Sequence, residues 1–200
     1  LIRHIEAGGV STLLYGGNAN LYHIAPSQYE TLLEMLCDIV AADTLVIPAV
    51  GPAFGTMMDQ AHVLRRYPFP SAMILPQKEI STSAGVVRSV TEFVQTMMRP
   101  AVLYIKHDHN IRVEDVVRLV EDHLLSAIKY AIVRTNPMED DYLRALVDAV
   151  GADLIVSGMG EQPARAHMQD FGLAGFTSGC VCIRPDLSSR MLRAVQSNEL

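Results

Sequence analysis

The sequence lacks any apolar run approaching the ~20 residues that a membrane-spanning helix needs. It also lacks blocks of one charge sign, because the net charge of −6 is spread along all 200 residues. We therefore predict neither a nucleic-acid partner nor a membrane partner. The chain opens with Leu-Ile-Arg-His-Ile-Glu-Ala, which has no signal-peptide pattern and no initiator methionine. A cytoplasmic protein is expected.

Cysteine and lysine are both scarce. The three cysteines include Cys180 and Cys182, which lie two apart on a probable strand, and no CxxC motif is present. Reduced thiols are the simplest interpretation, and Cys180 and Cys182 are expected to be small core residues. Only three of the sixteen basic residues are lysines, so each lysine can be tested separately.

The stretch from 101 to 133 contains the most informative pattern. Two short β-rich runs, 101–106 and 127–133, flank an amphipathic helix at 113–122, as in a β-α-β unit of a parallel sheet. Alternate residues on a strand share a face, so Lys129 belongs to an otherwise apolar face of the second run. An ammonium group is costly to bury unless it is paired or loses its proton, which makes Lys129 a candidate for chemistry.

Strands and helices alternate along the whole chain. The predicted strands are 10–15, 44–50, 71–75, 101–106, 127–133, 154–157 and 175–181. The predicted helices after them are 27–42, 54–66, 83–97, 113–122, 140–149, a short one starting near Pro163, and 187–195. Such repetition indicates an open doubly wound sheet or a closed (β/α)8 TIM barrel. No strand is followed by a GxGxxG motif or a P-loop, which disfavours the open nucleotide-binding sheet.

The strand count favours the barrel but leaves it one strand short. We therefore predict one (β/α)8-barrel domain over residues 1–200 that covers about the second strand to the eighth helix. On this interpretation the chain is a segment of a longer polypeptide, with the first strand and any C-terminal helices outside it.

Lys129 is the strongest candidate for a nucleophile. An amine attacks a carbonyl only when it is unprotonated, and an apolar barrel interior favours that form. A structural lysine that reaches solvent or pairs with a carboxylate is an equal alternative. Lys106, beside His107 and Asp108 at a strand end, is the rival amine, for which a solvated or paired role is expected. Tyr104 ends the neighbouring strand, where a phenol can relay protons or simply pack in the core.

Other polar groups fall where strands end. The turn at 16–20 can present backbone N–H groups to a carboxylate or be an ordinary turn. Ser157, Glu161 and Ser178 follow the last two predicted strands and are further candidates for substrate binding. His107 and His109 suggest a metal pair, but no further ligands fall at strand ends, so no metal site is predicted.

Several short motifs occur along the chain in an order that resembles that of the dihydrodipicolinate synthase/N-acetylneuraminate lyase superfamily. They are Leu103-Tyr104, Ile128-Lys129, Ser157-Gly158, and Gly175-Phe176-Thr177-Ser178 with Pro185. The resemblance covers essentially the whole chain. It implies a (β/α)8 barrel, a homo-oligomer (dimer or tetramer), and a Schiff base between Lys129 and a 2-keto acid such as pyruvate, with Tyr104 transferring protons. It implies no metal or organic cofactor.

The sequence also departs from the family pattern. The family's Gly-Thr-Thr-Gly-Glu loop, whose hydroxyls and amides hold the keto-acid carboxylate, corresponds here to Gly17, Asn18, Ala19, Asn20 and Leu21. The paired hydroxyls are missing, although Asn18 and the backbone amides of Gly17 and Ala19 can still donate. No tyrosine follows the strand at 71–75, and the position of the synthase arginine falls near His109. A divergent lyase, aldolase or dehydratase fits better than the lysine-biosynthetic synthase. The alternative is a non-catalytic protein that binds a keto acid or sugar acid on the same barrel.

Overall fold

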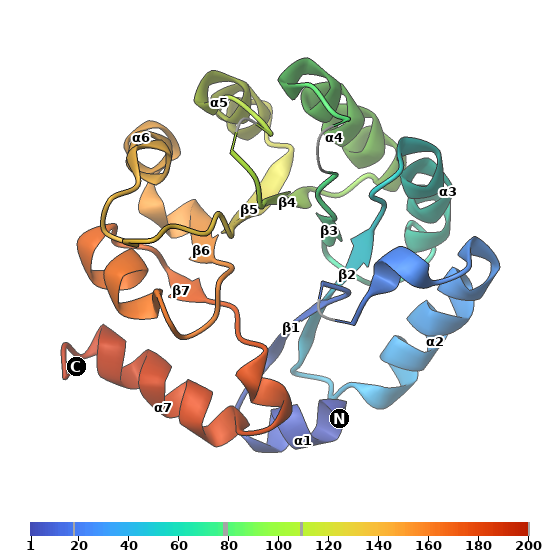
Figure 1. The fold of residues 1–200 in the computed structure, drawn as a ribbon. Coiled ribbons are helices and arrows are strands. Elements are labelled where there is room, and N and C mark those ends of the chain that lie inside the picture. The colour runs from blue at the N-terminus through green and yellow to red at the C-terminus, as the bar shows by residue number, and fades with distance from the viewer. Residues whose placement is uncertain (18, 78–79, 109, 200) are drawn as a thin grey trace.

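The computed structural model describes residues 1–17, 19–77, 80–108 and 110–199. These residues form seven parallel strands that pair in sequence order, β1-β2-β3-β4-β5-β6-β7. The strands curl into an arc with the helices on its outer side (Figure 1), which is a TIM-barrel-like arrangement. The strands are β1 (Thr12–Tyr15), β2 (Leu45–Val50), β3 (Ala72–Ile74), β4 (Ala101–Ile105), β5 (Leu125–Tyr130), β6 (Ile155–Ser157) and β7 (Gly175–Phe176).

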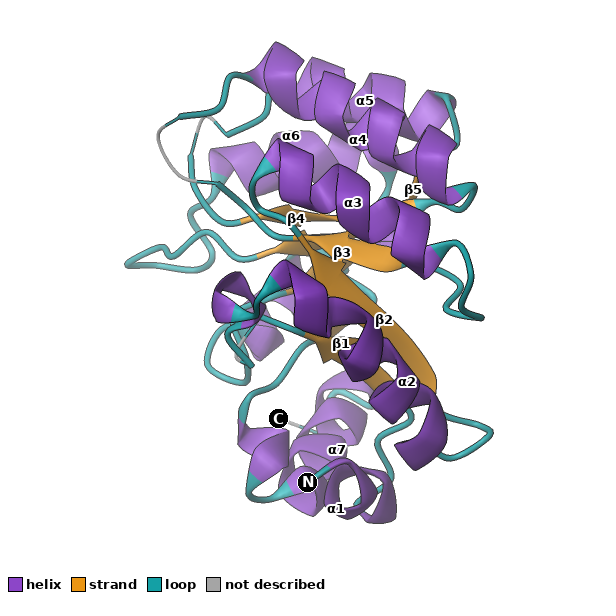
Figure 2. Cartoon of the chain, turned by 90° about the vertical axis from the view of Figure 1, so that its right-hand side faces the viewer, coloured by secondary structure: helices purple, strands orange, loops and turns teal. Residues whose placement is uncertain are grey.

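Along the chain the α-helices alternate with the strands, and in space they surround the curled sheet (Figures 1 and 2). They are α1 (Ile2–Ala7), α2 (Tyr29–Ile39), α3 (Phe54–Leu64), α4 (Ser83–Met97), α5 (Val113–Glu121), α6 (Asp141–Val150) and α7 (Pro185–Gln196). Shorter 3-10 turns and a π-helical segment, Ala166–Asp170, complete the chain. Among the described helices, none is long and apolar enough to cross a membrane.

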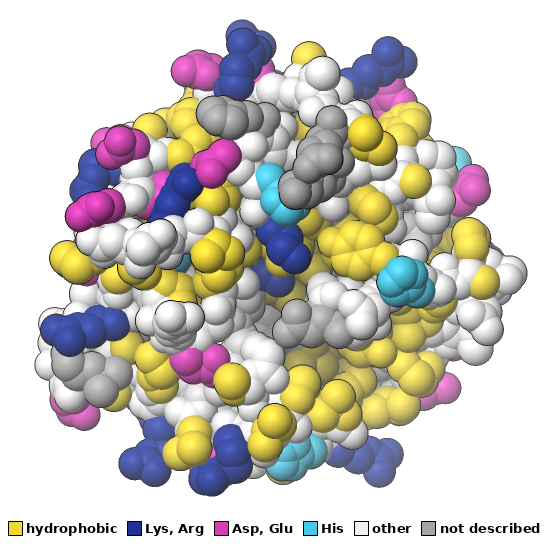
Figure 3. Space-filling view, viewed as in Figure 1, with side chains coloured by type: hydrophobic (Ala, Val, Ile, Leu, Met, Phe, Trp, Pro, Cys, Tyr) yellow, Lys and Arg dark blue, Asp and Glu magenta, His cyan; other side chains and the backbone are white. Residues whose placement is uncertain are grey.

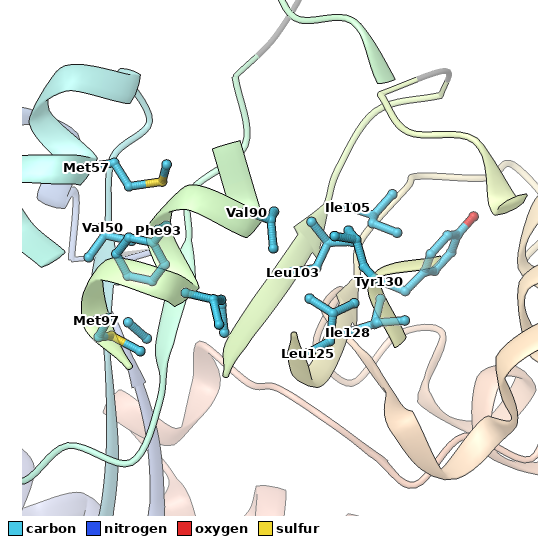
Figure 4. Close-up of a cluster of buried hydrophobic side chains, with 14 of the residues drawn as sticks. Val50, Met57, Val90, Phe93, Met97, Leu103, Ile105, Leu125, Ile128 and Tyr130 are labelled. Atoms are coloured by element: carbon cyan, nitrogen blue, oxygen red, sulfur yellow. The ribbon is translucent and has the colours of Figure 1, made fainter. Parts of the chain in front are cut away.

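The two faces of the curled sheet support two separate hydrophobic clusters. On the outer face, strand side chains such as Leu103 and Tyr130 pack in one cluster with helix side chains such as Phe93 of α4 (Figure 4). The inner face carries a smaller cluster that includes Ile47, Met73 and Tyr104. Both faces are apolar because helices cover one side and the strands enclose the other.

Side chains mark where two of the helices begin. Thr82 accepts a hydrogen bond from the backbone N–H of Gly85 at 3.1 Å and caps α4. Asp140 accepts one from Leu143 N–H at 3.1 Å and caps α6. Each cap satisfies an amide that the first turn of a helix leaves without a partner.

The last part of the chain differs from the sequence prediction. β7 ends at Phe176, not at residue 181, and Cys180 and Cys182 lie in an exposed 3-10 turn. The prediction that these cysteines are core residues on a strand was therefore wrong. An apolar run that is exposed in a turn has the same composition as a buried strand, so the pattern alone could not distinguish them.

The same region holds two smaller differences. The segment after Pro163 is a π-helix at Ala166–Asp170, and the final helix begins at Pro185. Pro185 occupies the first turn, where its missing N–H costs no hydrogen bond.

Candidate active site inside the barrel

Lys129 and Tyr104 lie side by side on neighbouring strands. The register pairs Tyr104 on β4 directly with Lys129 on β5. Both side chains are on the inner face, and Lys129 Nζ lies 4.2 Å from the centre of the Tyr104 ring. The alternation of the strands thus places a lysine amine and a phenol next to each other inside the barrel.

The environment of Lys129 makes its amine easier to deprotonate than that of an ordinary lysine. Only 8% of the residue is exposed. Burial, and secondarily the positive charge of Lys106, lower the pKa of Lys129 to about 8. Among the described residues, no acid forms an ion pair with Lys129. A lysine with this environment is suited to nucleophilic attack on a carbonyl.

The pKa of Tyr104 is shifted in the opposite direction to that of Lys129. Burial, together with the nearby Tyr22, raises the pKa of the Tyr104 phenol above its usual value. At neutral pH the phenol carries its proton, as any tyrosine does, and its hydroxyl is therefore a possible proton donor to a group beside Lys129.

The turn after β1 approaches the amine of Lys129. A Cβ built on Gly17 would lie 3.6 Å from Lys129 Nζ, so the Gly17 backbone borders the space around this amine. Ala19 is exposed, and the chain then reverses through Asn20 at φ 54° before Leu21 enters the inner cluster. Asn18, a predicted substrate-binding residue, lies outside the described residues.

Gly158 borders the stem of Lys129 from the other side. A Cβ at residue 158 would lie 2.9 Å from Lys129 Cγ, 3.0 Å from Lys129 Cε and 2.8 Å from Ala131 Cβ. Gly158 directly follows β6, and its N–H donates to the Tyr130 carbonyl at 2.6 Å. A side chain at residue 158 would therefore displace the lysine stem, because the backbone hydrogen bond holds residue 158 in place.

We expect Gly158→Ala to reduce the rate at which the Lys129 amine reacts with a carbonyl reagent by about tenfold or more, since the added methyl overlaps the lysine stem. Reductive methylation with formaldehyde and cyanoborohydride, followed by peptide mass, measures this rate. Gly55→Ala is the matched control, because a Cβ at Gly55 in α3 meets nothing within 4 Å. Equal methylation rates of Lys129 in the two variants would show that Gly158 does not position the lysine.

The structure does not bring Ser157 to Lys129. Ser157 pairs in register with Tyr130, whose side chain belongs to the outer cluster. The Ser157 hydroxyl lies 2.8 Å from His167 Nδ1 and is fully buried. Ser157 therefore faces the helical layer, one strand position out of phase with Lys129.

Glu161 and Ser178 form a cluster of their own. The hydroxyls of Ser178 and Ser188 both donate to Glu161 Oε1, the second at 2.5 Å. Burial raises the pKa of Glu161, but these hydrogen bonds outweigh it and hold the pKa below its usual value. The cluster joins the loops after β6 and β7 to α7, so its hydrogen-bonding capacity is largely used within the protein.

Lys106 and His107 follow the end of β4. Lys106 is exposed and lies just beyond the strand. His109, the second histidine of the pair that the sequence suggested, lies outside the described residues. Within the described ranges, no group of three or more potential metal ligands is found.

A partly buried ionic network at the ends of β4 and β5, centred on the buried Asp140, was not anticipated. The Arg134 guanidinium donates to both carboxylate oxygens of Asp108, at 2.9 and 2.7 Å, and to Asp140 Oδ1 at 3.1 Å. The Tyr130 hydroxyl donates to Asp140 Oδ2 at 2.5 Å. Since Tyr130 directly follows Lys129, the network holds the end of the strand that carries the lysine. The sequence indicated only the capping role of Asp140, because the predicted helix at 140–149 begins with this residue and Asp is a preferred N-cap.

The fold and its interior together define a TIM-barrel-like protein whose inner lysine forms no ion pair with any of the described acids. No protein-family model and no curated protein matches the chain. Solved structures do match: dihydrodipicolinate synthase from Oceanobacillus iheyensis has a TM-score of 0.86 at 20% identity. N-acetylneuraminate lyase from Fusobacterium nucleatum has a TM-score of 0.82 at 14% identity. YagE from E. coli K12, a member of the dihydrodipicolinic acid synthase family solved with pyruvate, has a TM-score of 0.82 at 14% identity.

These matches cover almost all of this chain and part of each neighbour. The alignment with the Oceanobacillus enzyme covers 99% of this chain and 65% of that chain. For the Fusobacterium lyase and YagE the shares are 98% and 67%, and 99% and 68%. The predicted resemblance to the dihydrodipicolinate synthase/N-acetylneuraminate lyase superfamily is thus confirmed at the level of the fold.

Proposed function

We propose that the protein is a Schiff-base-forming lyase or aldolase that acts on a 2-keto acid, such as pyruvate or a sugar-derived keto acid. The observation that carries this proposal is the position of Lys129. Its amine is buried on the inner face, has a pKa of about 8, and lies 4.2 Å from the Tyr104 ring. A lysine buried for packing alone would be expected to pair with a carboxylate.

In the proposed reaction, the neutral Lys129 amine attacks the C2 carbonyl of the keto acid. The resulting carbinolamine loses water to a protonated imine. The imine then accepts the electron pair of the C3–C4 bond in an aldol cleavage, or of a C3–H bond in a dehydration, after which the enamine expels the hydroxyl on C4. In the aldol cleavage Tyr104 gives a proton to the departing carbinolamine hydroxyl, takes one from the C4 hydroxyl as the C–C bond breaks, and passes it to C3 of the enamine. The chemistry requires no metal and no organic cofactor.

The turn after β1 is the proposed carboxylate site. A carboxylate on C2 lies next to the imine nitrogen, and a Cβ built on Gly17 of that turn would lie 3.6 Å from Lys129 Nζ. We propose that amides of Gly17 and Ala19 and the side chain of Asn18 hold it. Ser178 and Glu161 are proposed to support the rim through their mutual hydrogen bond. Ser157 has no place in this site, because it faces the helices.

We further propose that the seven strands correspond to the second to eighth strands of a (β/α)8 barrel, forming a single domain. The share of each neighbour that the alignments cover supports this assignment. A homo-oligomer, either dimer or tetramer, in the cytoplasm remains part of the proposal. Light scattering tests the oligomer: a mass of one chain at all concentrations would contradict it.

The second candidate function is non-catalytic binding of a keto acid or sugar acid. The turn at 17–21 favours it, because this turn lacks the paired hydroxyls of the family pattern. Binding by such a protein raises the melting temperature without a covalent bond.

Reduction with borohydride in the presence of pyruvate and sugar-derived 2-keto acids separates the two functions. We expect a stable adduct whose mass equals the reduced imine, on the peptide that contains Lys129. The three lysines fall at positions 78, 106 and 129, so peptide mapping assigns the adduct. A melting shift without any adduct would favour the binding protein.

A further inference from the structure

A small cavity lies beside Tyr104, at the strand ends where the inner and outer faces of the sheet meet. Its volume is about 70 Å³, and its lining includes Leu75 and Tyr104 from the inner cluster and Leu103 from the outer one. On the face that looks down the barrel, hydrophobic side chains gather beside the centre, on the side of β2 and β3 (Figure 3). The Tyr104 ring centre lies 4.2 Å from Lys129 Nζ, so Tyr104 borders both the cavity and the space around the amine.

Helix α4 forms one wall of this cavity, which we call the α4 cavity. The residues of α4 that line it are Gly85, Val86, Ser89 and Val90. Positions three and four apart lie on one face of a helix, so these residues present a single face to the cavity. Val90 is buried and Ser89 is partly exposed. Among the described residues, no hydrogen-bond partner of the Ser89 hydroxyl is found, so this hydroxyl is available to a ligand.

Asn110 brings an amide group to the same cavity. The residue is only 9% exposed. The Ser81 hydroxyl lies 3.3 Å from Asn110 Oδ1 and 3.1 Å from the Gln77 carbonyl oxygen, and it can donate to either. For Asn110 Nδ2, no acceptor is found within the described part of the chain. A buried amide without an acceptor is costly, so a ligand oxygen that accepts from Nδ2 would bind favourably.

The lining of the α4 cavity is uncharged. Among the described residues, no Asp, Glu, Lys, Arg or His lines it. A charged group placed there would lose its hydration without gaining a counter-ion, which is costly. The apolar walls, which include Pro52, Met57 and Val90, suit a carbon chain, and the hydroxyl and amide groups suit neutral oxygens. At about 10–15 Å³ for each water-sized group, the volume holds roughly five to seven of them.

We propose that the α4 cavity holds the short, uncharged, hydroxylated chain of a sugar-derived 2-keto acid, beyond the carbons that react. This inference rests on the proposed function, because the keto carbon of the same molecule would be bound to Lys129. The cavity then selects a sugar-derived acid over pyruvate, which has no such chain.

The test compares 2-keto-3-deoxygluconate with pyruvate in borohydride trapping. The half-saturating concentration is taken from the total Lys129 adduct of every mass, because the protein can cleave or dehydrate the sugar acid. Ser89→Leu enlarges a side chain on the cavity face of α4, so we expect the half-saturating concentration of the sugar acid to rise about tenfold. The value for pyruvate should not change, which also shows that the variant is folded. Arg88→Leu is the matched control, because Arg88 is exposed on α4 and does not line the cavity.

A second variant tests the hydroxyl groups of the ligand. Asn110→Leu keeps a similar volume and removes the amide, so the half-saturating concentration of 2-keto-3-deoxygluconate should rise about tenfold. The value for 2-oxohexanoate, which has the same chain length and no chain hydroxyls, should stay the same. The proposal is overturned if Ser89→Leu and Asn110→Leu leave the sugar acid unaffected, or shift it no more than pyruvate and 2-oxohexanoate.

A third measurement does not depend on imine formation. Reduction of 2-keto-3-deoxygluconate at C2 gives a hydroxy acid that keeps the chain but cannot condense with an amine. In calorimetric titration this acid should bind the wild type and Arg88→Leu alike, and Ser89→Leu about tenfold more weakly. If no keto acid is trapped while this pattern is seen, the lyase function fails and the α4 cavity remains a binding site. If keto acids are trapped but the hydroxy acid binds all three proteins equally, the cavity proposal fails alone.

Discussion

Lys129→Met is expected to abolish borohydride trapping of every keto acid and to lower any lyase activity at least a thousandfold. Methionine fills a similar volume but has no amine to attack a carbonyl, so the covalent route is lost. The variant should remain folded and at least as stable as the wild type, because a buried ammonium is replaced by an apolar group. Intact mass after reduction and circular dichroism measure the two effects.

The pH dependence of the wild-type protein provides the control for this prediction. With a pKa of about 8, about one tenth of the Lys129 amine is neutral at pH 7, against roughly one part in three thousand for an ordinary lysine. The neutral fraction reaches one half near pH 8, so the trapping rate should increase to about pH 9 and level off above it. An adduct on Lys106 in Lys129→Met, or a rate that still climbs past pH 10, would contradict Lys129 as the nucleophile.

Asp140→Ala is expected to lower the free energy of unfolding by about 3 kcal/mol, the lower end of the range for breaking a buried ion pair. Asp140 is buried, pairs with Arg134, accepts the Tyr130 hydroxyl, and caps α6. The lower end applies because Arg134 keeps Asp108 as a second partner. Urea denaturation measures the loss, which corresponds to a melting temperature lower by roughly 6–12 °C for a chain of this size.

The neighbouring Asp141 offers a matched control for this substitution. Asp141 is exposed in the first turn of the same helix, so Asp141→Ala should cost no more than about 1 kcal/mol. Burial raises the pKa of Asp140, but Arg134 and Tyr130 outweigh it and lower the pKa below its usual value. The contribution of the Asp140 carboxylate to the free energy of unfolding is therefore present above pH ~4. It is lost as the pH falls through the pKa of Asp140 in the folded protein. A stability difference that does not shrink as the pH falls below about 4 would show that charge is not its source.

The sequence by itself determined the alternation of strands and helices and the proximity of Lys129 and Tyr104. Strict β-α repetition leaves few ways to connect parallel strands, and a right-handed crossover places consecutive strands side by side. The seven predicted strands all occur in the structure, in sequence order. Because side chains alternate with period two, residues at matched positions of adjacent strands share a face, as Tyr104 and Lys129 do.

Only the tertiary structure decided which face is the inside of the barrel. Both faces of these strands are apolar, so the pattern could not show that Lys129 points inward while Ser157 points toward the helices. The stem contact of Gly158 and the network of Arg134 with Asp108 and Asp140 join residues from different loops. Such contacts depend on how the sheet curls, and no local spacing in the sequence records that curvature.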